Sequence, residues 1–161
     1  MSALRRPYLV PSLLVGLAVF ALDRGQKFAQ IELAGWRGGE VVRVTDFFDY
    51  VLVWNTGVSY GLLDTMPPLV LGLIALVAMT ALAIWWWRTP DMLVRFALML
   101  CLGGALSNAL DRLLYGAVAD FFHFHWQAYS FYIFNIADVA ISAGVLLLIL
   151  DLVGIGRRKQ L

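Results

Sequence analysis

Charged residues are scarce in this chain. Asp, Glu, Lys and Arg make up 14% of its 161 residues, whereas about 25% is typical of a soluble domain. Hydrophobic residues account for 61%, and the mean hydropathy is +0.80. The composition therefore excludes an ordinary soluble domain and indicates an integral membrane protein. The net charge of +1 says little about partners, and we expect no nucleic-acid partner.

Cysteine is nearly absent as well. The single one, Cys101, lies in an apolar run, which excludes a disulfide within the chain and indicates a packing residue. The chain has no G-x-S-x-G nucleophile motif and no G-x-x-x-x-G-K phosphate loop. Ser59 and Ser107 have no obvious general base, although a serine–lysine pair with Lys27 stays open.

Long apolar segments are abundant. A membrane-spanning helix needs about 20 apolar residues, and four segments approach that length, at about residues 8–28, 69–87, 92–110 and 134–155. The first follows Arg5 and Arg6, as in a signal peptide, but no A-x-A cleavage site follows, so we interpret it as an uncleaved helix. We predict one all-α membrane domain over residues 1–161, with four transmembrane helices.

The positions of Lys and Arg predict the orientation, because basic residues favour the cytoplasmic side. If the chain spans the membrane four times, seven basic residues fall together on the inner side: Arg5, Arg6, Arg88, Arg95, Arg157, Arg158 and Lys159. The outer side keeps Arg24, Lys27, Arg37, Arg43 and Arg112, together with most of the acidic residues. We therefore expect both termini to be cytoplasmic.

Two outer segments are more than linkers. The segment EVVRVTDFFDYVLVWN, residues 40–55, is rich in β-branched and aromatic residues, which favours strands or a small sheet. The second, residues 116–133, is rich in aromatic residues, and we expect it to lie on the membrane surface. Together they are expected to wall a cleft above the bilayer.

Asp120 and Asp138 are the candidate catalytic residues. Each ends a short motif at the edge of an apolar segment, and charged groups at membrane depth are usually functional. Two neighbouring carboxylates cannot both ionise, so one can act as a base toward water while the other donates a proton. Helix capping is the alternative for each aspartate taken singly, particularly for Asp138.

Other polar residues are expected to converge on the same outer ends. Asn108 and Arg112 share a helix face, and Arg112 is suited to hold a carbonyl or to pair with Asp111 or Asp23. Asp23 and Lys27 also fit a simple helix-end ion pair. The supporting residues are Asp23, Lys27, Asn55, Gly57, Asn108, Asp111, Arg112 and Asn135.

A metal site is not expected. Asp120 with His123 and His125 is a conceivable pattern, but the neighbours are aromatic and no further clear ligand lies nearby in the sequence. We expect no cofactor.

The motifs resemble those of the bacterial lipoprotein signal peptidases, or signal peptidase II. The resemblance covers nearly the whole chain, and five motifs in order carry it: Asp23 with Lys27, NTG at 55–57, GGALSNALDR at 103–112, YGAVADF at 115–121, and FNIAD at 134–138. It implies an aspartic endopeptidase of the bacterial inner membrane that cuts just before the lipid-modified cysteine of a diacylglyceryl prolipoprotein.

The resemblance also assigns roles. It places the catalytic pair on Asp120 and Asp138. For partners, we expect membrane lipids beside the lipid-modified precursor, and we expect a monomer. The family pattern differs here at Arg24 and Gln26, at Ser59-Tyr60 and at Ser107, which puts substrate preference in doubt but not the reaction.

Two other classes of function are weighed against the peptidase. A small transporter or channel subunit would use the same acids as an ion relay, but it needs polar residues through the membrane midplane. A structural membrane subunit would need no acids at all.

Overall fold

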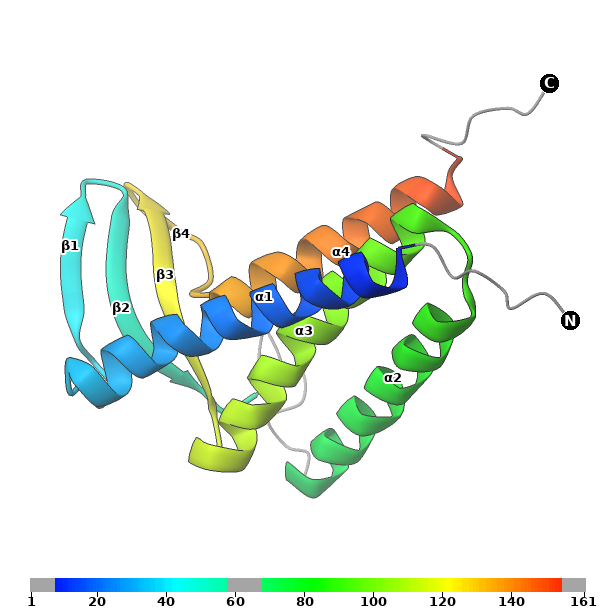
Figure 1. Ribbon diagram of the computed structural model, residues 1–161. Coiled ribbons are helices and arrows are strands. Elements are labelled where there is room, and N and C mark those ends of the chain that lie inside the picture. Colours follow the sequence, from blue (N-terminus) through cyan, green and yellow to red (C-terminus); the bar gives the residue numbers. More distant parts are fainter. Residues whose placement is uncertain (1–7, 58–67, 155–161) are drawn as a thin grey trace, which may run out of the picture.

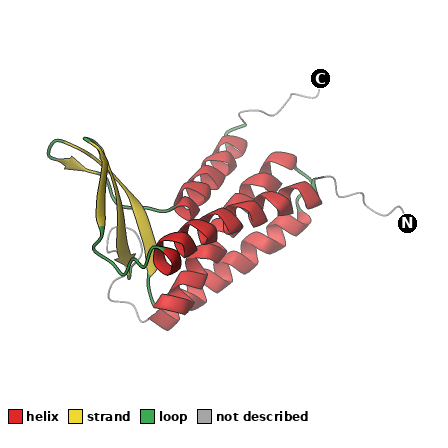
Figure 2. Cartoon of the chain, turned by 60° about the vertical axis from the view of Figure 1, so that its left-hand side comes forward, coloured by secondary structure: helices red, strands yellow, loops and turns green. Residues whose placement is uncertain are grey.

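The fold combines a bundle of long helices with a small antiparallel sheet at one end (Figures 1 and 2). A computed structural model of the chain describes residues 8–57 and 68–154. The helical elements are α1 (Leu9–Phe28), its π-helical extension η1 (Ala29–Leu33), α2 (Pro68–Arg88), α3 (Met92–Tyr115) and α4 (Ile136–Leu152). The strands are β1 (Val41–Thr45), β2 (Phe48–Asn55), β3 (Val118–Trp126) and β4 (Tyr129–Ser130).

Helix α3 is the centre of the bundle, since it packs against α1, α2 and α4. Glycines allow the closest approaches. A Cβ at Gly103 would meet the carbonyl oxygen of Gly16 in α1, and one at Gly104 would lie 2.5 Å from the carbonyl oxygen of Ala137 in α4. Small residues at such contacts let helix backbones pack tightly in a membrane, where no hydrophobic effect pulls helices together.

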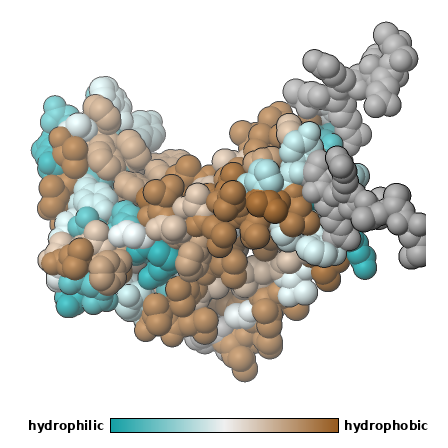
Figure 3. All heavy atoms as spheres, viewed as in Figure 1, coloured by the Kyte–Doolittle hydropathy of each residue, from teal (hydrophilic) through white to brown (hydrophobic). Residues whose placement is uncertain are grey.

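Helix α2 lies at the edge of the bundle (Figure 1) and exposes most of its apolar side chains. Figure 3 shows hydrophobic residues over most of the visible helical surface. Within the described residues, three helical segments are long and apolar enough to cross a membrane: Leu9–Leu33, Leu69–Arg88 and Met92–Tyr115. An exposed apolar surface on long helices fits contact with lipid.

The sheet has the strand order β1-β2-β3-β4, with antiparallel neighbours. A β-bulge in β2 shifts the register between Tyr50 and Val53, so that Val53 lies opposite Asp120. A small core of Ile31, Leu52, Ala119 and Phe121 joins the sheet to the end of the first helix. Strand β3, which carries Asp120, thereby lies beside the C-terminal ends of the first helix and of α3.

The fold is mostly helical with a small antiparallel sheet, which confirms the predicted helical architecture and the strands predicted within residues 40–55. The helix expected to end near residue 110 continues to Tyr115, and α4 spans 17 residues. Some predicted features lie outside the described residues: Arg5, Arg6, Ser59, Tyr60, Arg157, Arg158 and Lys159.

The aromatic segment at 116–133 differs from expectation, because much of it forms strands β3 and β4. Its strand pairing depends on β2, more than 60 residues earlier in the chain. A strand whose partner is that distant gives no local signal beyond its β-branched and aromatic content.

Candidate active site

Asp120 and Asp138 come from different elements but share a neighbour. Asp120 lies in β3 with only 2% of its surface exposed, and Asp138 lies in the first turn of α4 and is half-buried. Asn135, the residue that precedes α4, is hydrogen-bonded to both carboxylates. The structure therefore brings the two predicted acids together at the junction of sheet and bundle.

Two amide side chains donate hydrogen bonds to Asp120. Nδ2 of Asn135 lies 2.7 Å from Oδ1, and Nδ2 of Asn55 lies 3.0 Å from Oδ2. Burial and then the nearby charge of Asp138 together raise the pKa of Asp120 to about 7, against the opposing hydrogen bonds of the two amides. A carboxyl with this pKa can hold or release a proton at neutral pH.

Asp138 and Asn135 form a reciprocal cap at the start of α4. The Asn135 side chain accepts from the main-chain N–H of Asp138 at 2.9 Å, and Oδ2 of Asp138 accepts from the main-chain N–H of Asn135 at 3.2 Å. The structure therefore confirms that Asp138 takes part in the N-terminal cap of α4. Its other oxygen, Oδ1, accepts from Nδ2 of Asn108 at 2.9 Å, so the carboxylate also faces the site.

Asn108 and Asn135 also contact each other directly. Nδ2 of Asn135 donates to Oδ1 of Asn108 at 3.1 Å, and the same oxygen accepts from Nζ of Lys27 at 3.2 Å. The amide of Asn108 is therefore oriented from one side by Lys27, which fixes its NH₂ group toward Asp138. A chain of polar contacts thus runs from α1 through α3 to the first turn of α4.

Beneath this chain lies a buried group of charges. Nζ of Lys27 lies 2.7 Å from Oδ2 of Asp23 and 2.6 Å from Oδ2 of Asp111, and the side chains of all three are fully buried. Arg24 forms a further ion pair with Asp111, and Ser107 donates to Asp23 at 2.6 Å. The expected pair of Asp23 with Lys27 is present, but it is part of a larger network rather than a simple helix-end pair.

The buried carboxylates also satisfy backbone groups next to the candidate acids. Oδ1 of Asp23 accepts from the N–H of Ala137 at 2.9 Å, in the first turn of α4. Oδ2 of Asp111 accepts from the N–H of Ala119 at 3.1 Å, directly before Asp120. Each carboxylate thus fixes the backbone beside one candidate catalytic residue, and partnered buried charges of this kind are costly to disrupt.

Arg112 binds carbonyl groups. Its Nη2 donates to the carbonyl oxygen of Gly57 at 3.3 Å and its Nη1 to that of Asn108 at 3.4 Å. Among the described contacts, Asp111 pairs with Arg24 and Lys27, so the alternative pairing with Arg112 is not observed. The N–H of Gly57 donates to Asn55 at 3.1 Å, which orients the amide that holds Asp120.

The serine–lysine alternative finds no support in the described residues. Ser107 donates to Asp23 rather than to Lys27, and the lysine nitrogen is already shared by three oxygen atoms. Two participants were not identified from sequence. Arg24 and Ser107 were not among the supporting residues expected from the sequence, yet both bind the buried carboxylates.

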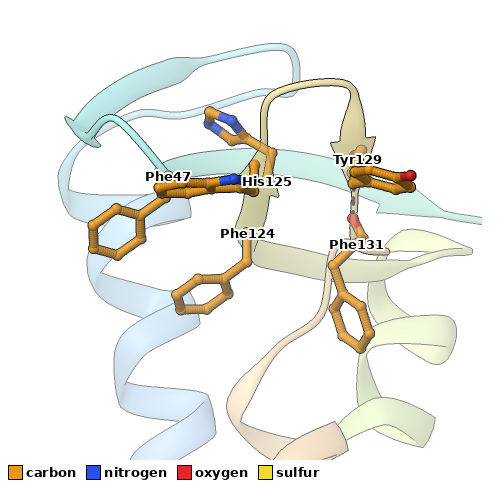
Figure 4. Close-up of a pocket in the computed structure, with 7 residues that line it drawn as sticks. Phe47, Phe124, His125, Tyr129 and Phe131 are labelled. Carbon is orange, nitrogen blue, oxygen red and sulfur yellow. Dashed lines mark hydrogen bonds between the residues drawn. The ribbon is translucent and has the colours of Figure 1, made fainter.

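An apolar pocket of about 700 Å³ opens at the far end of the sheet, and Figure 4 shows the rings of Phe124 and Phe131 beside it. Its lining consists mainly of aromatic residues, namely Phe47, Phe124, His125, Trp126, Tyr129, Ser130 and Phe131. This surface borders the same β-strand that carries Asp120, and it suits a hydrophobic ligand.

Metal-ligand side chains gather elsewhere on the sheet. The ligand atoms of Asp49, His123 and His125 lie within 4.8 Å of one another. The sequence offered no further ligand near the two histidines, because Asp49 comes from β2 and reaches them only through strand pairing. Asp120, the acid considered with them from sequence, is not part of this group.

Long apolar helices beneath two neighbouring carboxylates are features of a membrane protease of the aspartic class. The family model of signal peptidase (SPase) II matches residues 15–154, and the chain belongs to this family of membrane proteases. The resemblance noted in the sequence is thereby confirmed.

Several curated relatives are named lipoprotein signal peptidase. The protein from Beijerinckia indica is 44% identical over 147 residues, which cover 88% of each chain. The one from Nitrobacter hamburgensis is 50% identical and covers 73% of this chain and 74% of the relative. The one from Rhodopseudomonas palustris strain TIE-1 is 47% identical, with 86% and 89% covered.

Two solved structures share the fold. One, described as a bacterial membrane enzyme determined by the in meso method at 2.3 Å resolution, has a TM-score of 0.80 and 27% identity, with 94% of each chain covered. The other, determined by the same method at 1.9 Å, has a TM-score of 0.76 and 28% identity and covers 89% of this chain and 93% of that one.

Proposed function

We propose that the protein removes the signal peptide from diacylglyceryl-modified prolipoproteins and cuts just before the lipid-modified cysteine. The observation that carries this proposal is the shared contact of Asn135 with Asp120 and Asp138 at the edge of an apolar helical bundle. Two carboxylates joined in this way suit hydrolysis of a peptide bond by an activated water. The names of the curated relatives point to the same substrate class.

In the proposed reaction, Asp138 is the base and Asp120 the acid. The unprotonated Asp138 takes a proton from a water molecule, whose oxygen attacks the scissile carbonyl carbon. Protonated Asp120, with its pKa raised to about 7, donates to the carbonyl oxygen. The tetrahedral intermediate then collapses: Asp138, now protonated, gives its proton to the leaving peptide nitrogen, Asp120 takes back a proton from a hydroxyl of the intermediate, and the carbon–nitrogen bond breaks. No metal or covalent intermediate is required.

The supporting residues position these two acids. Asn55, Asn108 and Asn135 hold the carboxylate oxygens, while Asp23 and Asp111 hold the backbone beside each acid. Lys27 pairs with both of these buried carboxylates. Arg112 and Gly57 fix the end of β2, where Asn55 lies. This arrangement supports a site whose geometry is set before substrate binds, which reduces the cost of orienting the reacting groups.

The whole chain is proposed to work as one domain and as a monomer in the bacterial inner membrane, with four spans. Helix α4 rises about 25 Å at about 1.5 Å per residue, and Leu146 and Ile149 on it are half or more exposed, as lipid contact requires. With both termini cytoplasmic, the sheet and the paired acids face the outer side. The substrate's acyl chains and signal helix then reach the site laterally through lipid.

The aromatic surface of the sheet is proposed to clamp the substrate. Acyl burial contributes about 0.8 kcal/mol per CH₂ group, so contacts remote from the scissile bond supply ample binding energy. That energy can be used to position the bond between the two carboxylates. The pocket beside Phe124 and Phe131 is suited to an acyl chain or to apolar residues of the precursor.

The proposal is tested with purified protein and two matched precursors, one carrying the diacylglyceryl cysteine and one with that cysteine unmodified. We expect cleavage of the lipid-modified precursor only, with mass spectrometry locating the cut immediately before the modified cysteine. Equal cleavage of both precursors, or a cut at another bond, would overturn the substrate assignment.

An ion relay is less well supported. The buried charges near Asp23, Lys27 and Asp111 gather at one end of the bundle, whereas α4 has no charged residue between Asp138 and Asp151. A relay needs ionisable groups along the membrane depth.

A further inference from the structure

The sheet presents two chemically different faces. Successive side chains of a strand point to opposite faces, so Asp120, Phe122 and Phe124 share one face of β3 while His123 and His125 share the other. Figure 4 shows the rings of Phe124 and Phe131 toward the bottom of the view and the imidazole of His125 toward its top. The histidine face is therefore opposite to the face that carries Asp120.

Strand pairing brings an aspartate to this histidine face. Asp49 of β2 lies directly opposite His123, and residues paired in this way project from the same face. Oδ2 of Asp49 lies 3.0 Å from Nε2 of His125 and 3.6 Å from Nδ1 of His123. One carboxylate oxygen thus stands between two imidazole nitrogens.

These separations suit a bound transition metal. Zinc binds imidazole nitrogen and carboxylate oxygen at about 2.0–2.2 Å, so ligand atoms at two corners of a tetrahedron lie about 3.4 Å apart. The distances from Oδ2 of Asp49 to the two imidazole nitrogens, 3.0 and 3.6 Å, lie on either side of that separation, and all three ligand atoms lie within 4.8 Å of one another.

The surroundings of the two imidazoles fit metal ligands as well. Nε2 of His125 is buried and, although Asp49 is near, has no hydrogen-bond partner in the described part of the chain. Nε2 of His123 lies 2.7 Å from the hydroxyl oxygen of Ser130, which leaves Nδ1 directed toward Asp49. A metal-bound histidine typically has its second ring nitrogen held in this way.

We propose that Asp49, His123 and His125 bind one Zn²⁺ ion on the sheet face opposite Asp120. Two imidazoles and one carboxylate favour zinc over magnesium or calcium, which prefer oxygen ligands alone. The ion joins β2 to β3, and Ser130 links it to β4. The three side chains are 17–23% exposed, so water can occupy the fourth position. The site is distinct from the proposed peptidase chemistry and stabilises the sheet that holds Asp120.

The test is zinc binding by the full-length protein in detergent, purified without a polyhistidine tag and stripped with a chelator. Isothermal titration with Zn²⁺ alone measures stoichiometry and affinity, and Co²⁺ absorption reports coordination geometry. We expect one Zn²⁺ per chain and the visible bands of tetrahedral Co²⁺. Failure of the wild-type protein to bind either ion stoichiometrically would overturn the proposal, whatever its peptidase activity.

Single substitutions test which side chains bind the ion. Asp49→Asn, His123→Gln and His125→Gln keep the side-chain sizes, and we expect each to weaken Zn²⁺ binding by more than Ser130→Ala, which should cost about 10- to 100-fold. Asp46→Asn is the matched control, because Asp46 lies on the same hairpin with its side chain 93% exposed, and it should bind zinc as the wild type does. Unchanged binding in the three ligand variants, or equal loss in Asp46→Asn, would contradict the assignment.

Discussion

Nδ2 of Asn135 donates a 2.7 Å hydrogen bond to Oδ1 of Asp120, from a residue that also caps the helix carrying Asp138. One asparagine therefore has two separable roles. Its side-chain oxygen holds the start of α4, while its side-chain nitrogen holds a carboxylate of another element. The relative position of the two candidate acids depends on this residue.

Replacements of Asn135 should separate these roles. Serine caps helices about as well as asparagine, so Asn135→Ser should unfold at nearly the wild-type temperature. It lacks the amide donor to Asp120, and a hydrogen bond to a neutral group contributes about 0.5–1.5 kcal/mol. We expect precursor cleavage to fall by about 2- to 10-fold. Asn135→Ala should lose activity similarly and also about 1 kcal/mol of stability. Full activity in Asn135→Ser would contradict the bridging role.

The activity should decline as pH rises above neutrality. Burial and then the charge of Asp138 raise the pKa of Asp120 to about 7, and the proposed mechanism needs this group protonated. The cleavage rate should therefore fall by about tenfold for each pH unit above the pKa. Rates measured from pH 5 to pH 9 with one lipid-modified precursor check this. A rate that stays level to pH 9 would show that Asp120 is not the proton donor.

The same raised pKa predicts a pH-dependent stability. The folded protein holds the proton of Asp120 up to about pH 7, whereas an ordinary aspartate releases it near 3.8. Protonated Asp120 therefore makes its full contribution to the stability of the fold below the ordinary pKa of 3.8, and this contribution is lost as pH rises through about 7. When thermal unfolding is followed in detergent, the unfolding temperature of the wild type should fall relative to that of Asp120→Asn as pH rises from about 3.8 to about 7. A constant difference would rule out the shifted pKa.

Removal of Lys27 should destabilise the bundle strongly. Lys27→Met leaves Asp23 and Asp111 without their shared buried cation, and breaking such a pair costs about 3–5 kcal/mol. Arg43→Met is the matched control, because Arg43 pairs with Asp46 at an exposed position, where ion pairs contribute about 0–1 kcal/mol. Thermal unfolding of both variants measures the difference. Equal effects would mean that the buried network has no special structural role.

The close approach of α1 and α3 predicts an asymmetry between two glycines. A Cβ at Gly103 would meet the backbone of Gly16, so Gly103→Ala should cost about 1–3 kcal/mol through overpacking. Gly72 in α2 has nothing within 4 Å of an added Cβ, and Gly72→Ala should be neutral or stabilising by up to about 1 kcal/mol. Unfolding temperatures of the two variants test this, and similar destabilisation by both would contradict the packing described.

The sequence allowed much of this molecule to be anticipated for local reasons. Apolar runs define the helices directly, and the β-branched and aromatic residues within 40–55 mark the hairpin of β1 and β2. Asp120 and Asp138 stand out because charge is rare in apolar surroundings. Each of these signals lies within a short window of sequence.

Features that depend on distant partners were not predictable in the same way. The strand identity of β3 follows from pairing with β2, and Asp49 approaches the two histidines only after that pairing forms. Arg24 looked like a departure from a motif until the fold placed it against Asp111. Burial of Asp23, Lys27 and Asp111 together likewise requires the packing of α1 against α3.

The most direct test of the central claim is cleavage of a diacylglyceryl prolipoprotein by purified wild type, Asp120→Asn and Asp138→Asn at matched concentrations. Asparagine keeps the size of each side chain but can act neither as a base nor as a proton donor of this kind. We expect wild type to release the signal peptide, and both variants to remain folded and release none above background. Near-wild-type cleavage by either folded variant would contradict the proposed catalytic pair.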